Sequence, residues 1–238
     1  MKIKNLLDAY KLKISTTINV DLVFSQSGMV KEFPEFNFGF FPVGSGVFTG
    51  KSSMEEAEIE EGGTLVLGHD FGTVDYVINK CKNNSENNSK TINNLKDIGL
   101  EIEKTFFTNF YMGLRDNKNH PGTTMTKLIM PRQQDYKIFC FAFFKKQLEL
   151  INPKIVICLG TAVGKTLSEF SDVFSSFGLK KTTLSELYSD PNKENYIVNT
   201  NDKTFGQRKF ILIPHPSYAH INWKKHDIKL KIKNTLHH

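Results

Sequence analysis

Short apolar runs without polar alternation are the feature that most constrains the fold of this 238-residue chain. Leu65–Leu67 and Phe210–Ile213 are two of them, and Lys154–Leu159 contains a third. Runs of this kind are typical of strands buried on both faces of a parallel sheet. Strand and helix patterns alternate after residue 60, which predicts helices on both faces of that sheet. We therefore expect an α/β fold with three layers, α/β/α, and a mostly parallel central sheet of about four strands.

Helical spacing is clearest between Gln134 and Ile151, and Pro153 ends that helix. The apolar residues that would face the core there are Ile138, Phe141, Phe144, Leu148 and Ile151. A second helix is expected from Gly160 through Leu167. A final helix would bury the face formed by Ile228, Ile232 and Leu236.

The length fits a single domain, residues 1–238, with its core at about 60–220. Before the core, residues 18–24 alternate like an edge strand, and residues 25–60 contain a loop rich in Gly, Pro and Phe. The many rings of that loop need burial against the core or a ligand. Residues 82–90 are polar and of low complexity, which predicts a flexible surface loop. His237 and His238 resemble a purification-tag remnant and receive no role.

Charge and cysteine content narrow the function classes. The net charge is +6 with a pI near 9.0, which favours a polyanionic partner. The three cysteines include no CxxC pair, which argues against a disulfide framework and against a four-thiolate zinc or iron–sulfur site. Cys140 and Cys158 lie in apolar surroundings and are expected to be buried. Neither a signal peptide nor a membrane span is evident, so we expect a cytoplasmic protein, and we expect it to be a monomer.

Polar side chains follow the predicted strands. Asp70 comes after the first apolar run, Asn109 follows the Phe106–Thr108 stretch, and His215 and Ser217 follow the last run. Ligands of parallel sheets bind beyond the carboxyl ends of the strands, so these residues are expected to share one crevice. Each also has a structural interpretation: Asp70 as a helix N-cap, Asn109 as a turn residue, and His215 and Ser217 as loop residues.

The ordered set Gly68-His-Asp-Phe-Gly72, Thr108-Asn109 and His215-Pro-Ser217 resembles the uracil-DNA glycosylase superfamily. The segment from Pro153-Lys154 to Leu159-Gly160 matches the penultimate strand of that family. The resemblance covers about residues 60–220. Two departures stand out: His69 and Phe71 replace the usual Gln or Glu and the usual Pro or Ala, and the iron–sulfur cysteines of one branch are missing.

The resemblance implies roles for the motif residues. Asp70 would stabilise the cationic sugar and orient or deprotonate the attacking water. His215 would donate a hydrogen bond to the pyrimidine O2, with the backbone N–H of Phe71 as a second donor. Asn109 would bind the pyrimidine N3–H and O4, although an amide can be turned to accept cytosine.

Further contacts with the base and the DNA are expected from the residues themselves. His69 and rings of the Phe38–Phe48 loop would stack on the flipped base. Gly72 occupies the position at which strict uracil enzymes have a tyrosine that blocks bulk at pyrimidine C5, so a 5-substituted base would fit. The residues expected to contact the DNA backbone or to wedge into its stack are Ser217, Tyr218, His220, Lys224 and Lys225.

The sequence therefore predicts a monofunctional DNA glycosylase that acts on a flipped-out uracil or 5-modified pyrimidine in single- or double-stranded DNA, without metal or cofactor. No lysine occupies a motif position, so an abasic product without a Schiff base is expected. Two alternatives remain: an antiphage defence enzyme that excises hydroxymethylated or glucosylated cytosine, and a non-catalytic DNA-binding module. A phosphate-binding loop at Gly160–Thr166 is disfavoured, because three residues separate its glycines where four are needed.

Overall fold

The computed structural model describes residues 29–30, 61–70, 72–73, 90–112, 114–115, 134–178, 184–189, 194–216, 219, 223–224 and 227–237. Several predictions fall outside these ranges: the 18–24 strand, most of the 25–60 loop and residues 82–89. Five expected site residues also fall outside them, namely Phe71, Ser217, Tyr218, His220 and Lys225.

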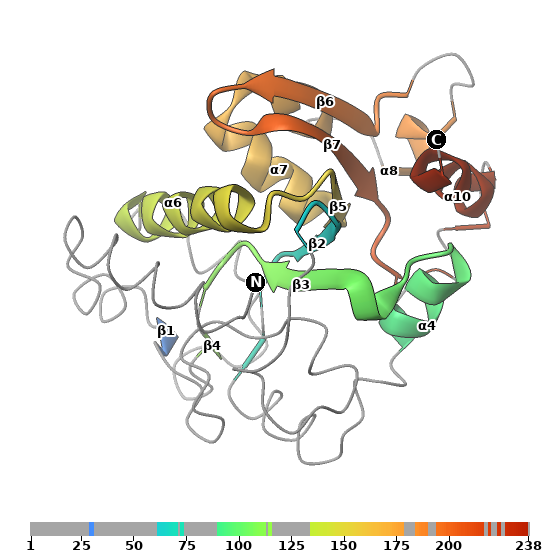
Figure 1. The fold of residues 1–238 in the computed structure, drawn as a ribbon, viewed down its shortest axis with the longest axis horizontal. Coiled ribbons are helices and arrows are strands. Elements are labelled where there is room, and N and C mark those ends of the chain that lie inside the picture. The colour runs from blue at the N-terminus through green and yellow to red at the C-terminus, as the bar shows by residue number, and fades with distance from the viewer. Residues whose placement is uncertain are drawn as a thin grey trace.

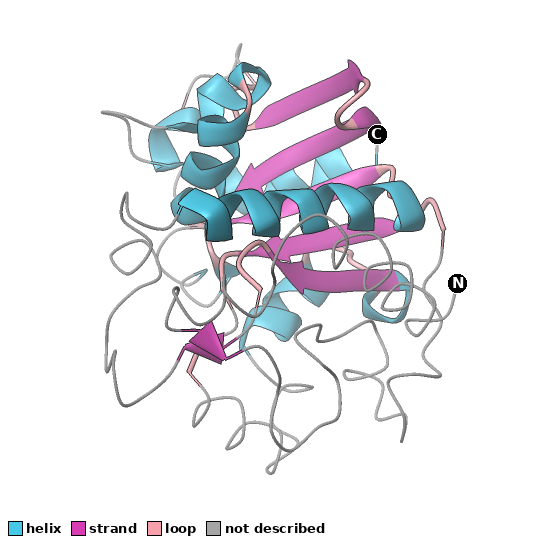
Figure 2. Cartoon of the chain, turned by 90° about the vertical axis from the view of Figure 1, so that its left-hand side faces the viewer, coloured by secondary structure: helices cyan, strands magenta, loops and turns pink. Residues whose placement is uncertain are grey.

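The central sheet has five strands in the order β3-β2-β5-β7-β6. Their bounds are Thr64–Gly68 for β2, Thr105–Asn109 for β3, Ile155–Leu159 for β5, Ile197–Asp202 for β6 and Gly206–Ile213 for β7. The four strands β3, β2, β5 and β7 are parallel, and β6 is antiparallel to β7 (Figure 2). A separate two-stranded pair joins β1, Met29–Val30, to β4, Leu114–Arg115. The predicted mostly parallel sheet is confirmed, with β6 as an addition.

Helices cover both faces of the sheet (Figure 1). On one side, α6 (Gln134–Ile151) and α7 (Thr161–Phe170) are joined by an ion pair of 2.8 Å between Lys137 Nζ and Glu169 Oε2. On the other side, α4 (Lys90–Asp97) and α10 (Ile228–His237) are joined by Lys229 Nζ and Asp97 Oδ2 at 3.2 Å. The shorter helices are η3 (Ile102–Lys104), η4 (Asp172–Gly178) and α8 (Leu184–Leu187). The three-layer α/β/α prediction is confirmed.

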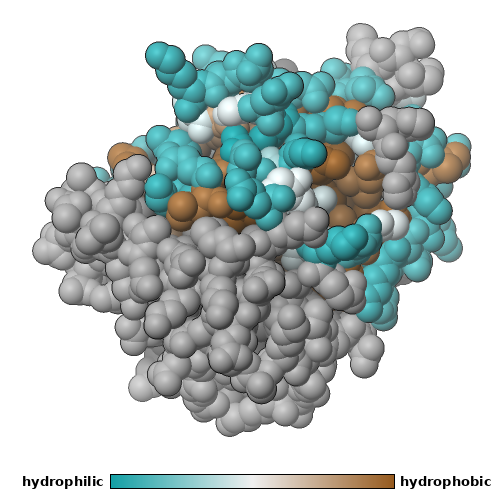
Figure 3. Space-filling model, viewed as in Figure 1, coloured by the Kyte–Doolittle hydropathy of each residue, from teal (hydrophilic) through white to brown (hydrophobic). Residues whose placement is uncertain are grey.

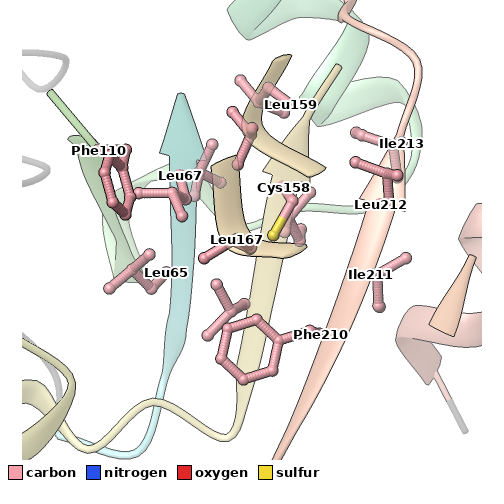
Figure 4. Packing of buried hydrophobic residues seen from close by; sticks show 14 of the residues in the cluster. Leu65, Leu67, Phe110, Cys158, Leu159, Leu167, Phe210, Ile211, Leu212 and Ile213 are labelled. Atoms are coloured by element: carbon pink, nitrogen blue, oxygen red, sulfur yellow. The ribbon is translucent and has the colours of Figure 1, made fainter. Parts of the chain in front are cut away.

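The core is centred on β2, β5 and β7. Leu65 and Leu67 on β2, Cys158 on β5 and Ile211 on β7 are all fully buried (Figure 4). Because both faces of these strands pack against helices, neither face needs polar side chains, which explains the unalternating runs. Figure 3 shows a largely hydrophilic described surface on the face in view, with hydrophobic residues visible between the hydrophilic ones.

Both described cysteines are buried, as predicted. Burial raises the pKa of Cys140 to about 12, and it raises the pKa of Cys158 even further. The thiolate is the nucleophilic form of cysteine, so neither side chain has the properties of a reactive thiol.

One detail of α6 was predicted wrongly. Ile138 is 45% exposed and Phe141 is only partly buried, whereas Phe144, Leu148 and Ile151 are buried as expected. The core-facing side also includes Tyr136, Phe139, Cys140, Phe143 and Gln147. Residues 138–144 are apolar all round the helix, so their spacing does not define which side faces the core.

The glycine-rich start of α7 has a packing role. A Cβ on Gly164 would lie 2.9 Å from both Leu212 Cδ2 and the carbonyl oxygen of Phe177. Gly164 therefore lets α7 approach β7 and η4 closely. Thr166 directs its hydroxyl to the carbonyl of Ala162 at 3.0 Å, within the helix. These contacts fit a strand–helix junction rather than a phosphate cradle.

Candidate active site

The connectivity of the sheet defines one crevice. The chain passes from β2 to its neighbour β3 and then crosses to β5 on the opposite side of β2. Such a reversal makes the space between the carboxyl ends of β2 and β5 the topological switch point, where ligands of open α/β sheets bind. Gly68 and Leu159 end these two strands. The described candidates at this edge, in the order of their strands, are Asn109, His69, Asp70 and His215.

The turn after β2 holds the carboxylate of Asp70 from two sides. Its Oδ1 accepts a hydrogen bond of 2.8 Å from the backbone N–H of Gly72. Its Oδ2 lies 3.1 Å from Nδ1 of His69. The two side chains are 15% and 14% exposed, so the pair is largely shielded from water. Gly72 has a φ of +86°, a conformation that favours glycine, and this closes the turn around the carboxylate.

An aromatic stack supports His69. The ring of Tyr111 meets the imidazole edge-on, with centroids 5.0 Å apart, and it stacks on the ring of Tyr136 from α6. The backbone N–H of Tyr111 also donates to the carbonyl of His69 at 3.0 Å. The Tyr136 hydroxyl donates to the carbonyl of Met112. Burial raises the pKa of Tyr111 far above its ordinary value, so this ring remains uncharged. Tyr111 was not identified from the sequence.

Asn109 lies against the end of β2. It is the register partner of Gly68 on the neighbouring strand. A Cβ built on Gly68 would lie only 2.0 Å from Asn109 Oδ1, so the side-chain amide crosses directly over that glycine. The bare backbone of Gly68 thus leaves the space that the amide occupies, next to the His69–Asp70 turn.

The loop after β7 is fixed on both sides of His215. The carbonyl of Pro214 accepts a hydrogen bond of 2.9 Å from the indole N–H of Trp223. The carbonyl of Pro216 accepts one of 2.7 Å from the side-chain amide of Asn94 on α4. These contacts hold the backbone of the loop, and neither donor was identified from the sequence. Asn94 and Pro216 are 122 positions apart, so the spacing of residues in the sequence gives no indication that they are in contact.

The His215 side chain reaches solvent, yet the surrounding protein removes enough water to lower the pKa of its imidazole. It is therefore neutral near pH 7 and has one N–H to donate. Gly160, with a φ of +83°, follows β5 and lies beside His215, and a Cβ there would lie 3.5 Å from His215 Cβ. Since β5 separates β2 from β7, the two histidine-bearing turns start about 10 Å apart along the edge.

This edge therefore offers an anionic carboxylate with its histidine partner at one strand, an amide beside it and a neutral imidazole donor two strands away. The carboxylate of Asp70 can stabilise positive charge, and the imidazole of His215 can donate a hydrogen bond to developing negative charge. Among the described basic residues near the C-terminus, Lys224 is exposed. Lys229 forms an ion pair with Asp97, and Lys231 donates a hydrogen bond to the carbonyl of Tyr188.

A hollow of about 780 Å³ lies at the opposite edge of the sheet and contains none of these candidates. Residues around the amino ends of β5 and β7 line it, including Lys154, Arg208 and Lys209. Arg208 Nη2 donates to the carbonyl of Leu148 at 2.8 Å and to Asn152 Oδ1 at 3.1 Å. These bonds cap the end of α6, so we interpret the guanidinium as structural.

Within the described ranges, no group of three or more His, Cys, Asp or Glu side chains could hold a metal ion. The same residues include no helix that is long and apolar enough to cross a membrane.

The chain matches the model of a known protein family. The model of the family described as the uracil DNA glycosylase superfamily matches residues 89–237, which is more than half of the chain. Asn94, Asn109, His215 and Trp223 lie inside the matched region, whereas β2 and the His69–Asp70 turn precede it. No curated protein matches the chain.

Proposed function

Because the chain belongs to the uracil DNA glycosylase superfamily, we propose that it is a monofunctional DNA glycosylase. It would hydrolyse the N-glycosidic bond of a flipped-out uracil or 5-modified pyrimidine in DNA. The observation that carries this proposal is the shared edge: the Asp70 carboxylate beside the switch point and the tethered His215 loop two strands away.

Cleavage of an N-glycosidic bond develops positive charge on the sugar and negative charge on the departing base. Asp70, held by the Gly72 N–H and His69, would stabilise the cationic sugar. His215, neutral because its pKa is lowered, would donate a hydrogen bond to the pyrimidine O2 as charge builds there. A donor fixed before the reaction costs little reorganisation in the transition state, and the two tethers on its loop suit that role.

Asn109 would bind the Watson–Crick edge of the base. Its amide offers one acceptor and two donors, which matches the O4 and N3–H of uracil. The contact with Gly68 would keep the amide facing the crevice, since it occupies space that any larger residue would fill.

Gly72 favours a base with a substituent at C5. Its φ of +86° strains any side chain there, so this turn does not suit the tyrosine that blocks C5 in strict uracil enzymes. The second candidate function, excision of hydroxymethylated or glucosylated cytosine from viral DNA, rests on this same position.

The test is mass spectrometry of free bases released from three DNAs: uracil-containing, thymine-mismatched and hypermodified phage DNA. Asp70→Asn should abolish release while DNA binding is retained, because the charge acts mainly on the transition state. Asp172→Asn, an exposed carboxylate on η4, is the matched control. Absence of release from all three DNAs, combined with tight binding, would favour the non-catalytic DNA-binding module.

A further inference from the structure

The contact between His69 and Asp70 defines which ring nitrogen has the proton. An ionised carboxylate only accepts hydrogen bonds, so the nitrogen that faces it, Nδ1, must be the N–H of the neutral imidazole. Nε2 then has the lone pair. No residue in the described part of the chain hydrogen-bonds Nε2. Within the part of the chain that the structure describes, the Asp70 contact thus fixes Nδ1, while Nε2 has no hydrogen-bond partner.

The neighbours of His69 favour this arrangement. Among the described residues, the ion pair of the ring is with Asp70, whose Oδ2 lies 3.1 Å from Nδ1. Tyr111 meets the ring edge-on and is uncharged, because burial raises the pKa of its hydroxyl. A carboxylate behind an imidazole that takes up a proton is the relation found in the His–Asp pair of serine hydrolases.

We propose that His69 is the general base of the reaction and that Asp70 orients it. This inference rests on the proposed glycosylase function and reassigns His69, which the sequence suggested as a stacking residue. An imidazole is a stronger base than a carboxylate, so it suits proton abstraction from water near neutral pH. Asp70 keeps its electrostatic role toward the cationic sugar.

A water oxygen forms a bond to the sugar C1′ and its proton moves to His69 Nε2. The bond between C1′ and the base nitrogen breaks, and its electron pair leaves with the base as an anion. The imidazolium that results is held by Asp70, and it returns its proton to solvent or to the departed base. No oxidant, reductant or co-reactant other than water is needed.

The first test needs no activity. Nitrogen-15 NMR of the imidazoles in the wild-type protein reports which nitrogen of His69 is protonated, and His69→Gln assigns the signal. We expect the Nδ1–H tautomer near neutral pH. The Nε2–H tautomer would overturn the proposal whatever the substrate, because the lone pair would then face Asp70.

The second test measures single-turnover release of the base that wild type excises. His69→Ala should slow release by about a hundredfold to ten-thousandfold, the usual contribution of a general base, and added imidazole should restore part of the rate. His69→Asn keeps an N–H for Asp70 but has no basic nitrogen, so it should also be slow. Thermal unfolding and DNA-binding measurements on each variant confirm that it is folded.

The outcomes separate the possibilities. A near-wild-type rate for His69→Asn would mean that His69 only positions Asp70, and failure of imidazole to raise the His69→Ala rate would likewise overturn the base role. Asp70→Asn is the control that imidazole should not rescue. If wild type releases no base from any DNA, the proposed function itself fails, whereas the Nε2–H tautomer in the NMR experiment would overturn only the base role of His69.

Discussion

The side-chain amide of Asn109 crosses the α-carbon of Gly68, so close that a Cβ on the glycine would lie 2.0 Å from Asn109 Oδ1. A neighbouring strand thus sets the position of the residue expected to read the base. Glycine is required at position 68 for space, and a substitution there acts on the site through Asn109.

We expect Gly68→Ala to reduce base release at least tenfold, because the methyl group displaces the Asn109 amide. The effect should depend on the amide. In a double-mutant cycle, Gly68→Ala should cost little more once Asn109→Ala is present. Additive losses in single-turnover rates would show that the glycine acts through some other contact.

Loss of a hydrogen-bond donor to the His215 loop should lower both the rate of base release and the stability of the fold. Trp223→Phe keeps an aromatic ring but leaves the carbonyl of Pro214 without its donor, which typically costs about 1–3 kcal/mol of stability at a buried site. The loop should also lose its fixed position, so we expect kcat to fall several-fold.

Tyr188→Phe is the matched control. It removes a 2.6 Å hydrogen bond to the carbonyl of Leu212, which lies within β7 rather than in the loop. Both variants should be destabilised in denaturant unfolding, and only Trp223→Phe should slow base release. Equal rates in the two variants would contradict a positioning role for Trp223.

The pKa of His215 gives a stability prediction with a definite sign. Above about pH 6.5, the ordinary value for histidine, the group is neutral in both the folded and unfolded states. As the pH falls through the lowered pKa of the folded state, the unfolded chain binds the proton more readily and stability is lost. His215→Gln should therefore lose less stability than wild type between pH 7 and 5. Thermal unfolding across that range checks this, and an equal loss in both proteins would oppose it.

The parallel strands could be predicted from the sequence because burial on both faces leaves runs such as Leu65–Leu67 without polar residues. The β6 strand was missed because Asn199 and Asn201 are exposed at the sheet edge, which makes the segment resemble a loop. The convergence of Asn109, Asp70 and His215 on one edge follows from parallel topology.

Other parts of the site depend on contacts that no local pattern reports. The His69 contact with Tyr111 arises only because β3 lies beside β2. The Asn94 and Trp223 tethers likewise come from helices and turns brought to the loop by folding. Asn and Trp side chains commonly form hydrogen bonds that only support the fold. The residue types at 94 and 223 therefore do not indicate a functional site.

The absence of lysine from the turn at 68–72 and from residues 215–217 predicts the product. Borohydride should trap no covalent adduct between the protein and DNA, since a Schiff base needs an amine at the sugar carbon. The released product should be intact DNA with an abasic site, visible as strand breaks only after alkali. A trapped adduct on denaturing gels would mean that a lysine from elsewhere enters the site.

DNA binding should weaken steeply with salt through Lys224 and Lys225. Lys224 is exposed on the stretch that follows the His215 loop, and Lys225 is next to it in sequence. If each contacts one phosphate, replacing both by alanine should reduce the slope of log affinity against log salt by about 2. The control is Lys137→Ala with Lys146→Ala, which removes the same charge from α6, where both lysines pair with glutamates. An unchanged slope for the first pair, or an equal change in the control, would place the phosphate track on another surface.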